Sequence, residues 1–329
     1  MNELLASVLR ITPEPYQHLD DMCIHHLLTR APQHYMGYIR AQLADIASGR
    51  AALELPHKQV FSDPEGAGDF RVMPCVVRNG SGARKIVKLV GTNVAQSLIP
   101  DQITVGKAFA LHPEEDFITH IFDACLLSSA RTGVCAALAL DWLSASRGRI
   151  AITGAGRVGY YAAFYAAAMG GVDEIILSDR DVAKANRTAA LLGKQFPATQ
   201  FHAQGCGEAS DCDALIIATT STAPLCAPND CNAPVIISLG ADSESQHELD
   251  SSWAGAADIY VDTLDSAHFG DLLAWHQAGL IALDDVTDLF GILRNGVSQH
   301  SGKTRIFIST GSALFDNLTI GYLLDHIHD

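Results

Sequence analysis

Apolar residues recur three and four positions apart in the first fifty residues, which is the period of a helix that buries one face. The pattern is clearest over residues 19–28 and 35–46, and Ser-Gly-Arg at 48–50 is typical of a helix end. Beyond residue 53 the pattern changes to short β-prone runs separated by turn-forming residues. Strands are therefore expected at 58–61, 70–77, 85–90, 103–111 and 117–124. Together these runs predict a mostly antiparallel sheet.

In the second half of the chain, continuous apolar runs alternate with helical segments. The runs lie at 149–153, 174–178, 214–219, 235–239, 259–261 and 305–309. Such strands are typical of a parallel sheet that is covered on both faces. Helices are expected at 128–143, 160–169, within 265–292 and at 314–326, where the chain returns to its first domain. The predicted class is α/β, with a doubly wound, Rossmann-type parallel sheet and a second, α+β domain.

The run at 149–153 leads into a glycine motif, Gly154-Ala155-Gly156-Arg157-Val158-Gly159, and a helical segment follows. Strand, G-x-G-x-x-G and helix in this order indicate a dinucleotide site. Gly154 permits the tight turn, Gly156 lets the backbone approach a pyrophosphate, and Gly159 lets the helix pack on the strand. The N–H groups at the helix start, around Arg157 and Val158, then face the phosphates.

Asp179 ends the next apolar run, at about the spacing that this motif requires. A carboxylate there accepts hydrogen bonds from ribose hydroxyls and repels a 2′-phosphate, so NAD is expected rather than NADP. Arg180 and Arg187 leave the alternative open, because a guanidinium can pair with that phosphate, although both are also typical of solvated charges at a helix start.

These patterns predict two domains. Residues 131–311 are expected to form the dinucleotide-binding domain, and residues 1–130 with 312–329 a discontinuous domain for substrate binding and dimerisation. The β-prone runs between residues 60 and 124 have few helices of their own to cover them, which favours a homodimer through this sheet.

The composition limits the function classes. The chain has 329 residues, of which 48% are hydrophobic and 18% charged, as in ordinary globular proteins. Its net charge of −15 argues against nucleic acid and anionic membranes as partners. The start lacks the apolar core of a signal peptide, and the apolar stretch at 160–172 is too short to span a bilayer, so a cytoplasmic protein is expected. The eight cysteines show no C-x-x-C spacing, so we predict no metal.

Several separated segments resemble, in order, the ornithine cyclodeaminase/mu-crystallin family. They are residues 71–74, 86–88, 103–105, 123–133, the glycine loop with Asp179, 238–242 and 306–313. The resemblance implies a homodimeric nicotinamide enzyme that acts on amino and imino acids. Ornithine cyclodeaminase, alanine dehydrogenase, ketimine reductases and a synthase for diaminopropionate precursors belong to this family.

Three cations match family positions that hold the substrate carboxylate, namely Arg71, Lys88 and Arg131. An α-amino acid offers such a carboxylate, and a planar guanidinium binds it through two hydrogen bonds. The alternative is that the three are surface charges.

Asp242 matches the family's catalytic aspartate, which passes protons to and from the reacting amine. The alternative is a helix cap. The Pro-Gly-Lys that usually follows this aspartate is replaced by Ser243-Glu244-Ser245-Gln246, which puts ornithine and alanine in doubt as substrates. Cofactor contacts are further implied at Thr104, Thr219, Leu239 and Ser309, whose hydroxyls, where present, are equally typical of structural groups.

The sequence thus predicts an NAD-dependent oxidoreductase that acts at the α-carbon of an amino or imino acid. It does not choose among cyclodeaminase, dehydrogenase, ketimine reductase and synthase. The altered segment after Asp242 keeps a second class open, a mu-crystallin-like protein that binds a ligand in a nicotinamide-dependent way with little turnover.

Overall fold

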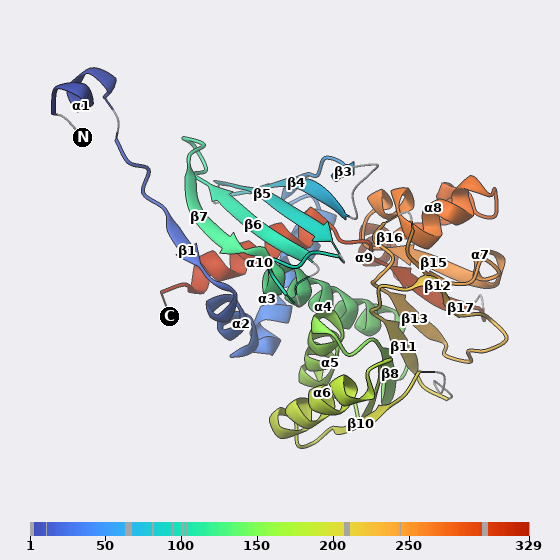
Figure 1. Cartoon of the computed structure of the whole chain (residues 1–329). Coiled ribbons are helices and arrows are strands. Elements are labelled where there is room, and N and C mark those ends of the chain that lie inside the picture. The colour runs from blue at the N-terminus through green and yellow to red at the C-terminus, as the bar shows by residue number, and fades with distance from the viewer. Residues whose placement is uncertain are drawn as a thin grey trace.

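The computed structural model describes residues 3–10, 12–62, 68–80, 82–93, 95–100, 102, 104–206, 211–243, 245–297 and 302–328. Two sheets lie on either side of a central helix, α4 (Ala124–Leu143), as Figure 1 shows. Ile103 of the strand predicted at 103–111 lies outside the described residues, as does Glu244.

The first sheet has the order β1-β7-β6-β5-β4-β2, and β3 also pairs with β4. Its strands are β1 (Gln17–Leu19), β2 (Ala52–Glu54), β3 (Gln59–Ser62), β4 (Gly68–Asn79), β5 (Gly82–Asn93), β6 (Thr104–Leu111) and β7 (Ile118–Asp123). All pairs are antiparallel except β1 with β7. Buried residues alternate along β4 and β5, and the register puts Arg71 and Lys88 on the same, buried face.

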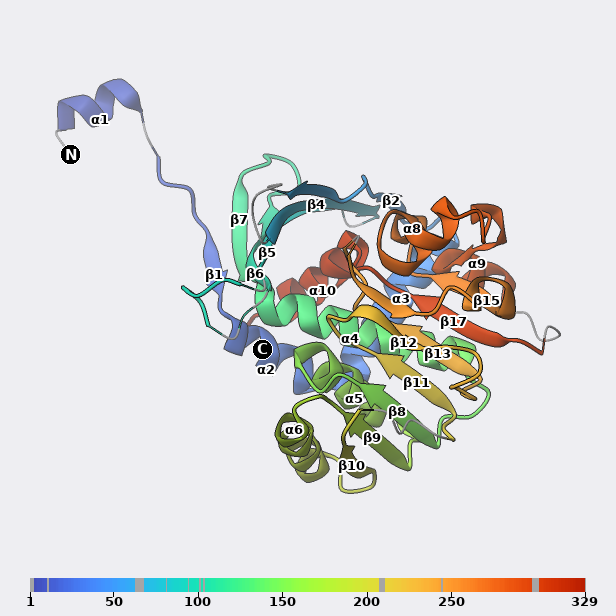
Figure 2. The same cartoon turned by 45° about the vertical axis from the view of Figure 1, so that its right-hand side comes forward.

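Helices cover only that buried face of the described sheet. α10 (Ala313–His326) runs beneath β4 and β5, and the side-chain amide of Asn317 donates to the carbonyls of Cys75 and Arg84. α2 (Asp21–Thr29) and α3 (Pro32–Ala47) complete this layer. α1 (Glu3–Leu9) lies apart from the rest at the end of an extended segment (Figures 1 and 2). α10 therefore returns the chain to its first sheet, as the sequence predicts.

The second sheet is parallel throughout, with the order β10-β9-β8-β11-β13-β17-β15-β16. Its strands are β8 (Arg149–Thr153), β9 (Glu174–Ser178), β10 (Gln200–Gln204), β11 (Ala214–Ile217), β13 (Val235–Ser238), β15 (Ala257–Val261), β16 (Thr287–Asp288) and β17 (Thr304–Ile308). A short ribbon of β12 (Thr222–Cys226) and β14 (His247–Leu249) lies beside it. The predicted class and the Rossmann-type sheet are confirmed.

Helices cover both faces of this sheet, because alternate residues of its strands enter two separate cores. The helices and 3₁₀ turns are α5 (Arg157–Met169), α6 (Val182–Gln195), α7 (Trp253–Ala256), η1 (Leu264–His268), α8 (Gly270–Gln277), η2 (Leu283–Asp285) and α9 (Leu289–Asn295). The winding reverses between β8 and β11, and open α/β sheets bind their ligands at such a point.

Several boundaries differ from the sequence prediction. Residues 17–19 form β1 on the edge of the first sheet, where a helix is expected from residue 19, because pairing with β7 overrides the local helical pattern. α4 begins at Ala124 rather than Ser128, directly after β7, so the predicted division at residues 130 and 131 falls inside one helix. The predicted helical segment 265–292 is broken into η1, α8, η2, β16 and α9.

The apolar stretch at 160–172 is too short to span a bilayer, but α4 is a longer apolar segment. Within the described chain, it is the helix long and apolar enough to cross a membrane, yet 83% of its apolar window is buried inside the protein. Its position between the two sheets accounts for this composition.

Candidate active site

A large cleft lies between the two sheets, at the carboxyl ends of the parallel strands. Both sheets contribute to its lining. On the side of the first sheet lie Arg71, Lys88 and Thr104 of its strands and Lys58 just before β3, and on the side of the second lie residues of the loops that follow its strands, Gly154, Asp179, Thr219 and Asp242. α4 adds Arg131. The structure therefore brings the predicted phosphate loop and the predicted carboxylate-binding cations to one cavity.

The glycine loop fits a dinucleotide on steric grounds. Gly154 has φ +100°, a conformation that favours glycine, and a Cβ there would overlap the Ala218 carbonyl. A Cβ on Gly159 would likewise overlap the carbonyl oxygen of Gly154, so α5 can approach β8 only with glycine at this position. The N-cap of α5 is Gly156, which has no side chain to cap the helix start, and Arg157 and Val158 line the cleft there. The first-turn N–H groups of α5 suit a phosphate.

Asp179 lies at the end of β9, beside the glycine loop. Its carboxylate accepts from the Ala155 N–H (2.9 Å) and the Asp181 N–H (3.0 Å). Burial favours a higher pKa, but these hydrogen bonds, with the charge of Lys184, lower the pKa of Asp179 below its usual value. The group is thus an ionised acceptor that also orders the loop.

Arg71 joins two carboxylates in the cleft. Its Nη1 donates to Asp242 (2.6 Å), and its Nε and Nη2 donate to the two oxygens of Asp69 (2.7 and 3.0 Å). The Arg71 side chain is 5% exposed and that of Asp242 is 36% exposed. Burial favours a higher pKa for Asp242, but the charges of Arg71 and Lys58 outweigh it and lower the pKa. Asp242 therefore faces the cleft as a carboxylate.

Lys88 and Arg131 share a third carboxylate, Asp316 of α10. The Lys88 Nζ lies 2.5 Å from one Asp316 oxygen, and the Arg131 Nε lies 3.1 Å from the other. Asp316 is fully buried, so it fixes both cations from below the cleft. Burial lowers the pKa of Lys88 to about 7, although Asp316 favours the charged form. The sequence reasoning missed Asp316, which lies 185 residues from Arg131.

Lys58 is a fourth cation that the sequence reasoning missed. Its Nζ donates to the Thr310 carbonyl (3.0 Å) and lies 3.6 Å from the centre of the Phe269 ring. Burial lowers the pKa of Lys58 to about 8, against the attraction of Asp242. A single lysine before an ordinary strand carries no recognisable sequence signal.

Glu248, also missed, organises the loops after β11 and β13. One carboxylate oxygen accepts from the N–H and hydroxyl of Thr219, and the other from the Ser238 hydroxyl and the N–H groups of Leu239 and Gly240. Burial raises the pKa of this carboxyl to about 7. Thr219 and Leu239, both predicted to contact the cofactor, thus line the cleft through loops that Glu248 holds.

The remaining predicted positions differ in their exposure to the cleft. Thr104, the first residue of β6, lines it. Ser309 is not among the lining residues, and its buried hydroxyl donates to Asp262 (2.7 Å). Gln246, which stands where the family usually has lysine, lines the cleft and accepts from the Asp242 N–H (3.2 Å).

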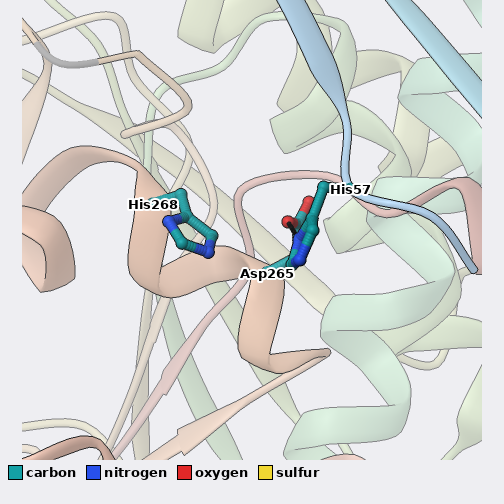
Figure 3. A group of neighbouring side chains, drawn as sticks. All are labelled: His57, Asp265 and His268. Atoms are coloured by element: carbon teal, nitrogen blue, oxygen red, sulfur yellow. Dashed lines mark hydrogen bonds and ion pairs between the residues drawn. The ribbon is translucent and has the colours of Figure 1, made fainter.

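A cluster outside the cleft contains potential metal ligands. Figure 3 shows His57 beside Asp265, with His268 facing them from the same short helix as Asp265. One potential ligand atom from each lies within 4.8 Å of the others, and the His57 Nδ1 is 2.6 Å from an Asp265 oxygen. Because the two histidines are exposed and the carboxylate already pairs with His57, the absence of a metal stays our prediction.

Comparisons with known proteins agree with this architecture. The profile of the ornithine cyclodeaminase/mu-crystallin family matches residues 24–329. Alanine dehydrogenase of Archaeoglobus fulgidus is 27% identical over 259 residues, which span 76% of this chain and 77% of that relative.

Two solved structures share the fold. Thermococcus litoralis Δ1-pyrroline-2-carboxylate reductase, in complex with NADH and L-proline, has a TM-score of 0.82 at 18% identity, over 94% of this chain and 98% of that one. An archaeal alanine dehydrogenase dimer with bound NAD has a TM-score of 0.81 at 22% identity, over 94% and 95% of the two chains. The profile match confirms the resemblance in the sequence: the chain belongs to the ornithine cyclodeaminase/mu-crystallin family.

Proposed function

We propose that the chain is an NAD-dependent oxidoreductase that acts at the α-carbon of an amino or imino acid. The observation that carries this proposal is the meeting, in one cleft, of a glycine loop shaped for a pyrophosphate, paired cations and a carboxylate. The solved relatives that bind NAD or NADH support the choice of cofactor.

The glycine loop, with Asp179 at its side, fits the cofactor. Gly154, Gly156 and Gly159 would admit the pyrophosphate, with Arg157 and Val158 at the helix start, and Asp179 would accept from the adenosine ribose. Thr219 and Leu239 on the second sheet, with Thr104 across the cleft, would flank the nicotinamide end. When bound, NAD supplies a hydride acceptor, and NADH supplies a hydride donor.

The cations would orient the substrate. Lys88 and Arg131, fixed by Asp316, would hold the α-carboxylate, and Arg71 would assist from β4. Asp242 would take a proton from the substrate amine as an imine forms, and return one in the reverse direction. The imine is then hydrolysed, attacked by an internal amine, or reduced, which distinguishes a dehydrogenase, a cyclodeaminase and a ketimine reductase.

We also propose a homodimer through the outer face of the first sheet, and a cytoplasmic location. Phe61, Phe70 and Leu89 are exposed on that face, and the Phe61 and Phe70 rings stack at 4.7 Å. In Figures 1 and 2 none of the described helices covers it. An alanine dehydrogenase of the same fold is a dimer, which supports the proposal. The proposal also keeps the predicted domain division, with residues 131–311 as the dinucleotide-binding domain and residues 1–130 with 312–329 as the discontinuous second domain.

The test is incubation of purified protein with NAD and a panel of L-amino acids and secondary amino acids, with NADH absorbance and product mass as readouts. Turnover of one compound, lost in Asp242→Asn, is the expected result. Tight NADH binding with no turnover across the panel would favour the ligand-binding alternative, which the replacement of the usual lysine by Gln246 keeps open.

A further inference from the structure

Resting on the proposed function, we propose that the substrate carries a second carboxylate besides the one on its α-carbon. The chain would then act on a dicarboxylic amino acid or the corresponding imino acid. The charges of the cleft, and the placement of Lys58 and Arg71, carry this inference.

Four cations line the substrate end of the cleft, and three carboxylates pair with them. The cations are Lys58, Arg71, Lys88 and Arg131, and the carboxylates are Asp69, Asp242 and Asp316. Among the described residues, Lys58 is the one of these four cations with no carboxylate in ion-pair contact. The α-carboxylate of a monocarboxylic amino acid is offset by its own amine, whereas a dicarboxylic amino acid brings a second carboxylate that can pair with Lys58.

Among these four cations, Lys58 is the one that forms no ion pair with a described residue. It is 9% exposed, and its ammonium makes no ion pair with any residue that the structure describes. The nearby Asp265 accepts from the Lys58 backbone N–H and lies 2.6 Å from His57, and both it and Asp242 attract the ammonium only from beyond ion-pair distance. Burial of an ammonium without a counter-ion is costly. A ligand carboxylate in the cleft supplies that counter-ion.

Arg71 offers the second half of the anion site. Among the described residues, Arg71 makes three hydrogen bonds, to Asp69 and Asp242, which leave two of the five N–H groups of a guanidinium for a ligand. The α-carboxylate has a separate place, since Lys88 and Arg131 are both fixed by Asp316. Lys88 with Arg131 thus suits the α-carboxylate and Lys58 suits the second one, and the remaining N–H groups of Arg71 allow it to assist at both.

This arrangement couples recognition to proton transfer. The charge of Arg71 helps to lower the pKa of Asp242. A substrate carboxylate on Arg71 competes for that charge, which raises the proton affinity of Asp242 when the correct substrate is bound. A substrate without the second carboxylate leaves the charge of Arg71 on Asp242, so the proton affinity of Asp242 stays low.

The first experiment compares acids with their uncharged isosteres on the wild-type protein. We expect kcat/KM for L-aspartate or L-glutamate to exceed that for L-asparagine or L-glutamine at least tenfold. Equal or better use of the amides, of L-alanine or of L-ornithine would overturn the inference. Lys58→Met should bring the ratio of acid to amide close to one, whereas Lys194→Met, the same change on the exposed surface of α6, should keep it.

A binding measurement separates this inference from the proposed reaction. If no amino acid turns over, the oxidoreductase proposal fails, but the anion site is still tested by succinate and propanoate, which cannot react. Succinate should raise the melting temperature of the protein–NADH mixture at concentrations at least tenfold lower than propanoate does. Equal potency of the two acids would overturn the inference whatever the activity.

Discussion

At the scale of single residues, the cleft holds each ionisable group in a state that its neighbours decide. Arg71 and Lys58 keep Asp242 ionised, and burial makes Lys58 and Lys88 unusually easy to deprotonate. Charges that are removed from water and surrounded by opposite charges have pKa values set by geometry rather than by residue type. Substitutions that keep shape and change charge are therefore the informative ones.

Asp242→Asn and Arg131→Lys should fail in different ways. The first keeps shape and removes the base, so kcat should fall roughly 10²-fold or more while NADH affinity changes little. The second keeps charge and loses the planar fork, so KM should rise sharply and kcat should fall less. Kinetics corrected for active sites, with thermal melts, check this. Near-normal kcat in Asp242→Asn would leave the residue a structural role only.

Asp179→Ala should weaken NAD binding by about 1.5–3 kcal/mol, the value of a hydrogen bond to a charged group. The loss has two sources, because the carboxylate faces the expected ribose position and also fixes the Ala155 N–H of the glycine loop. Titration of NADH fluorescence measures the change. An unaltered dissociation constant, or a preference of the wild type for NADP, would remove Asp179 from the cofactor site.

Carboxylate binding should weaken as the pH rises above about 7. A carboxylate binds the protonated forms of Lys88 and Lys58, whose pKa values are lowered to about 7 and about 8. Each group that deprotonates in the unliganded protein makes binding up to about tenfold weaker per pH unit. The inhibition constant of succinate, which has no amine to titrate and one carboxylate for each lysine, should therefore rise between pH 6.5 and 9. Lys58→Met should remove one of the two transitions, and a flat profile would contradict both assignments.

At the scale of elements, the loops that end β11 and β13 depend on one carboxylate. Glu248→Gln replaces an acceptor oxygen with an N–H₂ group that faces existing donors. We expect a loss of about 1–3 kcal/mol of unfolding free energy and weaker NADH binding. Glu54→Gln is the matched control, because its pair with Arg78 is exposed and such pairs contribute little. Denaturant titration measures the free energy of unfolding of both variants. Equal losses in the two would show that Glu248 does not organise these loops.

The same scale shows which parts of the site the sequence could predict. The glycine loop and Asp179 have a local signature, since strand, turn, helix and next strand follow one another along the chain. Lys58, Glu248 and Asp316 have none, because each acquires its neighbours only when distant segments pack together. Asp316 reaches Arg131 across 185 residues, and a single acid on an apolar helix resembles any other. Likewise, residues 17–19 form a strand only because they pair with β7 at the edge of the first sheet.

At the scale of the whole molecule, one apolar sheet face lacks cover from the described helices. If it forms the dimer interface, Phe70→Glu should give a monomeric mass in light scattering at micromolar concentration where the wild type is a dimer. Leu280→Glu is the control, because Leu280 is 50% exposed on the other domain and Phe70 is 52% exposed. A monomeric wild type would refute the proposal.

The path of α10 has a consequence for how the protein is made. This helix follows both sheets in the chain, yet it supplies Asp316 to Lys88 and Arg131 and Asn317 to the first sheet. A ribosome-bound chain that has exposed both sheets still lacks the anion that fixes its two buried cations. Assembly of the cleft therefore waits until α10 has emerged from the ribosome, and a nascent chain halted before Ala313 should bind no substrate.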